Sequence, residues 1–189
     1  MLFEIVDDWE QLSEKIGGKV NFTESIRANI DGYLFKPEIH KNTKKGNVVV
    51  NQTIMVFADK LQFVPIVINY FASSNRNIDL QIWNKGFFEK IFNIGINIGD
   101  NELDNKFCIK SSSIQEVTTL LKNKEFKNYL LNVMTYIRII TTDGIINVSL
   151  KVSSHKEVLK SIKMIELIES VLNPICIPRS CQIETGEST

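Results

Sequence analysis

The sequence predicts an α+β fold: a single domain in which helices pack on one face of a mostly antiparallel sheet. Three observations lead to this prediction. Short β-rich runs follow one another with short polar connections, which favours antiparallel pairing. Segments with helical periodicity stand before, between and after these runs. Asp143-Gly144, a pair suited to a tight hairpin turn, joins two β-rich runs near the C-terminal end.

The composition is typical of a chain that can bury a core without disulfide bonds. The 189 residues are 43% hydrophobic and 23% charged, and 22 Lys plus Arg balance 22 Asp plus Glu. This balance argues against a nucleic-acid partner, because binding to phosphates usually requires a basic excess. We expect residues 1–175 to form the domain and residues 176–189 to form a flexible tail.

The N-terminal half predicts one helix followed by four strands. Helical spacing of apolar residues indicates a helix over 7–16, which Gly17-Gly18 would end. Alternating or β-branched runs predict strands over 25–35, 47–57, 63–71 and 78–83. The first two would form a hairpin around a solvated polar loop at 41–47, and Pro65 would lie at a strand start or edge.

The C-terminal half predicts three helices around a hairpin. The segment 85–95 is ambiguous between helix and strand, and we interpret it as a short helix. Two capping boxes, Ser113 with Glu116 and Ser154 with Glu157, mark helix starts on either side of a second helix at 125–134 and the hairpin at 136–152. The last helix would end at Asn173-Pro174.

The stretch "IGDNELDNKFCIK" places Asp100, Glu102 and Asp104 at alternate positions. A helix-loop-helix calcium site also uses alternate oxygen ligands, but it needs Gly at its sixth position and Glu at its twelfth, and this chain has Asn105 and Ser111 there. A different cation site stays open. Our preferred interpretation is a turn through residues 99–100, polar residues on an exposed edge, and the apolar residues of 107–109 turned into the core.

A resemblance supports this structural interpretation. The run "GDNELDNKFCIKSSSIQEVTTLL", followed by "FKNYLL" and the "TTDGIINVSL" hairpin, resembles a pattern in a family of uncharacterised bacterial proteins. In that pattern a Gly-Asp turn, an acidic-apolar-Asp step and a Phe lead into a strand, a helix, an Asp-Gly hairpin and a C-terminal helix. The likeness covers roughly residues 95–172. It implies no catalytic residue, and some proteins of this kind carry membrane segments ahead of the soluble part.

The sequence contains no motif typical of the common catalytic chemistries. We interpret His40, in the polar loop, and His155, at a helix start, as solvated. No nucleophile elbow or phosphate loop is present. Cys176 and Cys181 could join Cys108 and His155 around zinc, but their spacing is not a recognised zinc knuckle, and three cysteines are too few for a disulfide framework. We predict no cofactor. Acid–base chemistry by carboxylates stays open, because sequence does not show which of them converge.

These observations predict a non-enzymatic binding or interaction domain, for a partner protein, a second copy of the chain, or a small apolar ligand between sheet and helices. The alternative is a carboxylate-dependent hydrolase or transferase. A third hypothesis is a membrane-peripheral module that docks on a tethered partner. No apolar stretch suggests an integral membrane segment or a signal peptide, so a cytoplasmic location is expected. The candidate surface consists of Asp100, Glu102, Asp104, Phe87 and Phe88, although we prefer a core role for the two aromatic residues.

Overall fold

The computed structural model describes residues 2–26, 32–57, 60–74, 78–86, 95–112, 114–132 and 136–172. The predicted turn at 75–77, the aromatic segment with Phe87 and Phe88, the Ser113 capping box, Asn173-Pro174, Cys176, Cys181 and the tail lie wholly or partly outside these residues. The described helices are α1 (Leu2–Ile16), α3 (Asn101–Lys106), α4 (Ile114–Lys122), α5 (Lys124–Asn132) and α6 (His155–Leu172).

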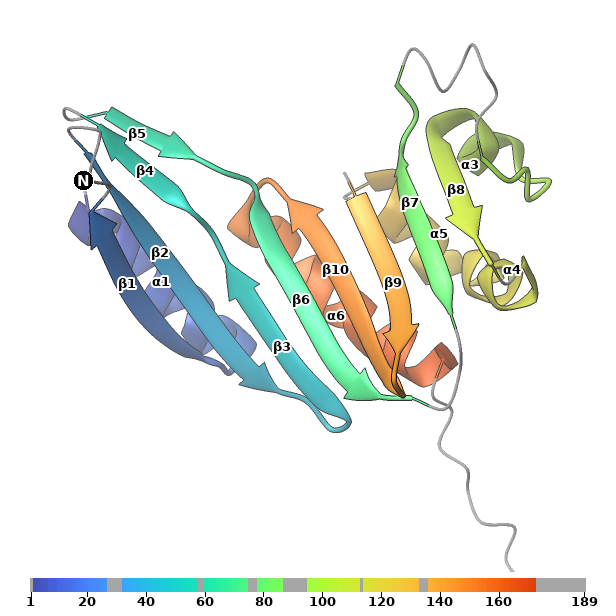
Figure 1. The fold of residues 1–189 in the computed structure, drawn as a ribbon, viewed down its shortest axis with the longest axis horizontal. Helices are drawn as coiled ribbons and strands as arrows, with labels where there is room; N and C mark the ends of the chain where they lie inside the picture. Colours follow the sequence, from blue (N-terminus) through green and yellow to red (C-terminus); the bar gives the residue numbers. More distant parts are fainter. Residues whose placement is uncertain are drawn as a thin grey trace, which may run out of the picture.

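The described strands form one antiparallel sheet, which confirms the predicted fold class (Figure 1). The hydrogen-bonded order is β5-β4-β2-β3-β6-β10-β9-β7-β8; β4 and β3 pair with successive parts of one edge of β2, and β1 pairs with its other edge. The strands are β1 (Lys19–Ile26), β2 (Gly32–Asn42), β3 (Gly46–Asn51), β4 (Ile54–Phe57), β5 (Lys60–Phe63), β6 (Ile66–Ser73), β7 (Asp79–Asn84), β8 (Phe107–Ser111), β9 (Tyr136–Thr142) and β10 (Ile145–Val152).

The N-terminal elements differ from the prediction in their bounds. Helix α1 begins at Leu2 rather than at residue 7, and it ends at Gly17, whose φ of 69° suits glycine. The predicted strand over 25–35 was wrong: its middle, 27–31, lies outside the described residues, and its two ends belong to different strands, β1 and β2, which pair antiparallel. The predicted strand over 47–57 is divided into β3 and β4 at Gln52, whose backbone N–H donates to Pro37 O at 3.3 Å.

The hairpin of β9 and β10 is confirmed. Asp143 and Gly144 have φ angles of 51° and 73°, as a tight hairpin turn requires at both central positions. The helix start at Ser154 is also confirmed: Glu157 N donates to Ser154 Oγ at 3.3 Å, and the Glu157 carboxylate accepts from Ser153 N, one residue before the expected capping-box donor, at 2.7 Å. Local side-chain chemistry therefore defines both ends of β10.

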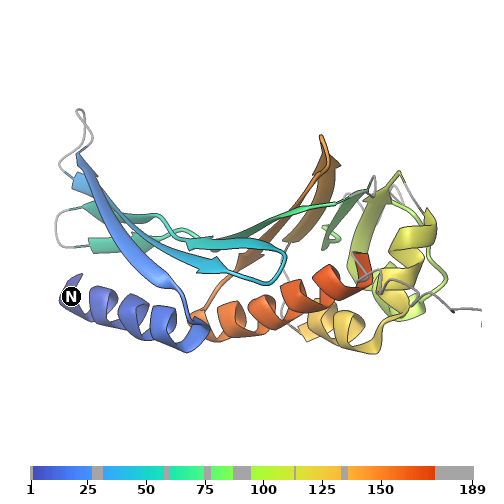
Figure 2. The ribbon, with the colours of Figure 1, turned by 90° about the horizontal axis from the view of Figure 1, so that it is seen from below.

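Helices cover one face of the sheet and leave the other face open (Figure 2). Alternate residues of β10 are buried beneath α6, and one stripe of α6 is buried against them. Helix α1 lies under β1 and β2, and α4 and α5 pack beside α6. The residues that meet in this core include Ile146, Val148, Leu150, Val152, Val158, Ile162, Ile165 and Ile168. The open face has no helical cover among the described residues, so its side chains decide what the sheet can bind.

Candidate functional site

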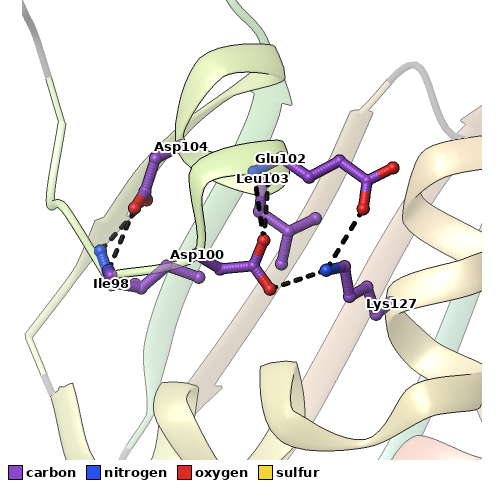
Figure 3. Close-up of polar contacts among 7 residues, drawn as sticks. Ile98, Asp100, Glu102, Leu103, Asp104 and Lys127 are labelled. Atoms are coloured by element: carbon purple, nitrogen blue, oxygen red, sulfur yellow. Dashed lines mark hydrogen bonds and ion pairs between the residues drawn. The ribbon is translucent and has the colours of Figure 1, made fainter.

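The acidic stretch forms a short helix, α3, where we expected a turn followed by polar residues on an exposed edge. Asp100 is its N-cap and accepts hydrogen bonds from the backbone N–H groups of Glu102 and Leu103 at 3.1 and 3.3 Å (Figure 3). Leu103 is fully buried, which anchors the helix against the core. The predicted turn at Gly99 is present, and the buried Phe107 confirms that the chain turns inward at β8. The N-cap carboxylate of Asp100 and the burial of Leu103 therefore stabilise a helix in this segment.

Asp104 closes the turn that leads into α3. Its two carboxylate oxygens accept from Ile98 N and Gly99 N, each at 3.0 Å. Its side chain therefore points back at the preceding loop rather than toward Asp100. The three carboxylates do not converge on one point, and among the described residues no group of three or more His, Cys, Asp or Glu side chains could hold a metal ion.

Lys127 of α5 joins the remaining two carboxylates. Its Nζ lies 2.7 Å from Asp100 Oδ2 and 3.2 Å from Glu102 Oε2. The Lys127 hydrogen bond, with help from the backbone N–H groups of α3, lowers the pKa of Asp100, and Asp100 in turn raises the pKa of Lys127. All three acidic candidates thus hold α3 in place: Asp104 fixes the loop that precedes it, and Asp100 and Glu102 dock it on α5.

The two histidines have different environments. His40 lies within β2 rather than in the polar loop, but it is exposed as predicted, and its Nε2 lies 2.6 Å from Glu38 Oε1. His155 is only partly solvated, which corrects the prediction: its ring is half-buried, 5.1 Å from the Trp9 ring at an interplanar angle of 83°. Burial lowers the pKa of His155. Cys108 is fully buried in β8, as expected for an inert thiol.

A buried polar cluster joins three distant parts of the chain. Glu169 of α6 is 9% exposed and accepts hydrogen bonds from the Tyr70 hydroxyl of β6 and from Thr43 Oγ1, the latter at 2.9 Å. Burial, and then the neighbouring Glu169, raise the pKa of Tyr70. The loop at 43–45 was predicted to be solvated; instead Thr43 docks on α6, and Lys45 Nζ lies 3.5 Å from Glu169 O. No local signal in the sequence predicts this cluster.

The open face of the sheet carries a groove of about 700 Å³ over β6, β10 and β9. The strand register sets its side chains in cross-strand rows: Phe71, Asn147 and Ile140 form one row, and Asn69, Ser149 and Arg138 form the next. The Lys151 ammonium lies 5.4 Å from the centre of the Tyr136 ring in a third row. The groove is lined by Asn69, Phe71, Tyr136, Arg138, Ile140, Thr142, Asp143, Ile145, Asn147, Ser149 and Lys151.

The sequence alone did not identify this groove. The available signal was the placement of Phe71, Tyr136 and Ile145 at positions that alternate with the core residues. Phe71 and Ile145 remain 39% and 51% exposed, unusually open for large apolar residues in mid-sheet.

Comparison of the chain with protein-family models, curated proteins and solved structures finds no match to any of them. Within the described ranges, none of the helices has the length and apolar character needed to cross a bilayer.

Proposed function

We propose that this protein is a non-enzymatic binding domain, and that it holds an extended segment of a partner protein in the groove on the helix-free face of the sheet. The observation that carries the proposal is the groove itself, in which apolar, amide and cationic side chains share one open surface. Such a mixture is typical of protein interfaces, where apolar anchors are bordered by polar groups.

The dimensions of the groove suit an extended segment. From Ile145 to Lys151 the strand rises about 20 Å, at roughly 3.3 Å per residue, which matches about six residues of extended chain. Phe71 and Ile145 offer an apolar seat at one end. The amides of Asn69 and Asn147 lie between the ends, where they can hydrogen-bond to the backbone of a bound segment.

The charge of the groove favours an acidic partner. Arg138 is exposed in the middle row, and in the part of the chain that the structure describes no carboxylate forms an ion pair with it. Of the residues that line the groove, only Asp143 is acidic, and it lies in the turn at one end. A planar guanidinium binds carboxylates through paired hydrogen bonds. We therefore infer a segment that places Asp or Glu near Arg138 and apolar side chains near Phe71.

The interior gives less support to the other hypotheses. Side chains with no exposed area fill the space between the sheet and the helices; examples are Ile68, Val148 and Ile165. Among the described residues, this packing gives little support to a site for an apolar ligand there. The carboxylates at 100–104 hold α3 in place, which gives the carboxylate-dependent enzyme no assembled acid–base pair in that segment.

The test is a selection of short random peptides on the wild-type chain, followed by binding measurements on variants. Arg138→Glu reverses the charge within the groove, whereas the matched control Lys36→Glu reverses an exposed charge on β2, outside it. We expect selected peptides to combine acidic and apolar residues, to bind more weakly at higher salt, and to lose about ten-fold or more in affinity for Arg138→Glu. Lys36→Glu should change affinity less than about two-fold.

Two results would count against the proposal. Peptides that bind wild type and Arg138→Glu equally would show that Arg138 recognises no acidic group. If no peptide is selected, and if an apolar dye binds wild type but not Phe71→Ser, a small apolar ligand would be favoured instead.

A further inference from the structure

Strands β8 and β1 lie on opposite sides of the sheet, and they differ in how their outer edges are covered. At β8 the backbone N–H of Ile96 donates to Ile109 O at 2.7 Å, so a loop lies against that edge. At the opposite end β1 pairs only with β2, and none of the described segments pairs with its outer side (Figure 1). Strand β1 has eight residues and no proline. An uncovered edge of this length can accept another strand.

The hydrogen-bond pattern shows which groups of β1 face outward. Thr43 N donates to Gly46 O at 2.8 Å, and Gln52 N donates to Pro37 O, so the odd-numbered residues of β2 bond toward β3. Since bonding direction alternates along an antiparallel strand, the even-numbered residues of β2 bond toward β1. Their register partners in β1 are Lys19, Asn21, Thr23 and Ser25. The backbone N–H and C=O groups of the intervening residues therefore point away from the sheet; these residues are Val20, Phe22 and Glu24.

We propose that β1 pairs antiparallel with β1 of a second copy of this chain, about a two-fold axis at Phe22. In this register Phe22 meets Phe22 of the second copy, and Val20 meets Glu24 on each side. Each of these three pairs can exchange two backbone hydrogen bonds. The axis is perpendicular to the sheet, so the helices of both copies lie on the same side of one continuous sheet.

The side chains of β1 suit a second copy in this register. The Phe22 ring is half-buried and stacks on Phe35 at 5.5 Å between ring centres, and pairing at the axis would extend this aromatic contact. No like charges face each other between the two copies, because Lys19 is opposite Ser25 and Glu24 is opposite Val20. A register centred on Glu24 would instead oppose two carboxylates, which is unfavourable.

The first test is the mass of the full chain by light scattering, with two variants of one residue. Glu24→Pro removes an outward N–H that the β1–β2 ladder does not use, and Glu24→Thr removes the same exposed carboxylate but keeps the N–H. We expect a dimer for wild type and for Glu24→Thr, and a dissociation constant at least about ten-fold weaker for Glu24→Pro. The helical circular-dichroism signal of each variant should match that of wild type.

A second test reads the register, in a background where Cys176 and Cys181 are Ser. The double variant Asn21→Cys/Thr23→Cys should form a disulfide between copies, because these two positions face each other across the axis. Thr23→Cys alone should not. A monomeric wild type at high micromolar concentration, a dimer that Glu24→Pro leaves intact, or efficient cross-linking of Thr23→Cys alone would overturn the proposal. The groove over β6, β10 and β9 is remote from β1, so Arg138→Glu should leave the mass unchanged and the two proposals fail separately.

Discussion

The Tyr70 hydroxyl should contribute more to stability than an equivalent hydroxyl with a neutral partner. Tyr70 is 1% exposed and donates to the Glu169 carboxylate, so Tyr70→Phe removes one oxygen and leaves the ring packing intact. A hydrogen bond to a charged group contributes roughly 1.5–3 kcal/mol, because a buried charge that loses a donor cannot recover it from water. The Thr43 hydroxyl would remain as a side-chain donor to Glu169. We expect Tyr70→Phe to lower the free energy of unfolding by about 2 kcal/mol.

Tyr129→Phe is the matched control. The Tyr129 hydroxyl is also buried, but its partner is the neutral Ser161 hydroxyl at 2.6 Å. Ser161 would still donate to Glu157 O at 2.7 Å after the substitution, so nothing buried is left unsatisfied. The expected cost is about 1 kcal/mol.

Thermal and urea unfolding of the two variants measure the difference. For a chain of this length each kcal/mol corresponds to about 2–4 °C, so Tyr70→Phe should lower Tm by about 6 °C and Tyr129→Phe by about 3 °C. In a Glu169→Gln background the cost of Tyr70→Phe should fall to that of the neutral pair. Equal costs for Tyr70→Phe and Tyr129→Phe in the wild-type background would refute the role of the Glu169 charge.

Three further predictions concern the N-cap of α3, the half-buried His155 and the hairpin glycine Gly144. Asp100→Ala should lower the free energy of unfolding by about 1 kcal/mol, because it removes the N-cap of α3, and urea unfolding should show a clearly smaller loss for Glu102→Ala. Since burial lowers the pKa of His155 in the folded state, the stability present above its ordinary value of 6.5 should decline as pH falls through the lower folded value; His155→Gln should flatten this decline in urea midpoints, and His40→Gln should not. Gly144→Ala should cost about 1 kcal/mol by thermal unfolding, because φ is 73° there, and an unchanged Tm would contradict the turn assignment.

Elements with strong local signals could be predicted, and those without could not. The hairpin at Asp143-Gly144 and the start of α6 at Ser154 rest on contacts within a few residues, so their sequence patterns were sufficient. The alternating carboxylates did not indicate the helix α3, because this helix depends on capping by Asp100 and on the burial of Leu103 in the core. The sequence contains no pattern strong enough to predict that β1 and β2 are separate strands.

By itself the sequence determined the α+β class, the inward faces of the long strands and the positions of several turns, because periodicity and turn chemistry act over short distances along the chain. Only the tertiary structure decided which polar groups are buried and which face remains open. Glu169 meets Tyr70 across 99 positions and Thr43 across 126, and Arg138 lies in a groove because β9 is placed beside β10. Strand order and helix placement create these neighbours, and no short stretch of sequence contains that information.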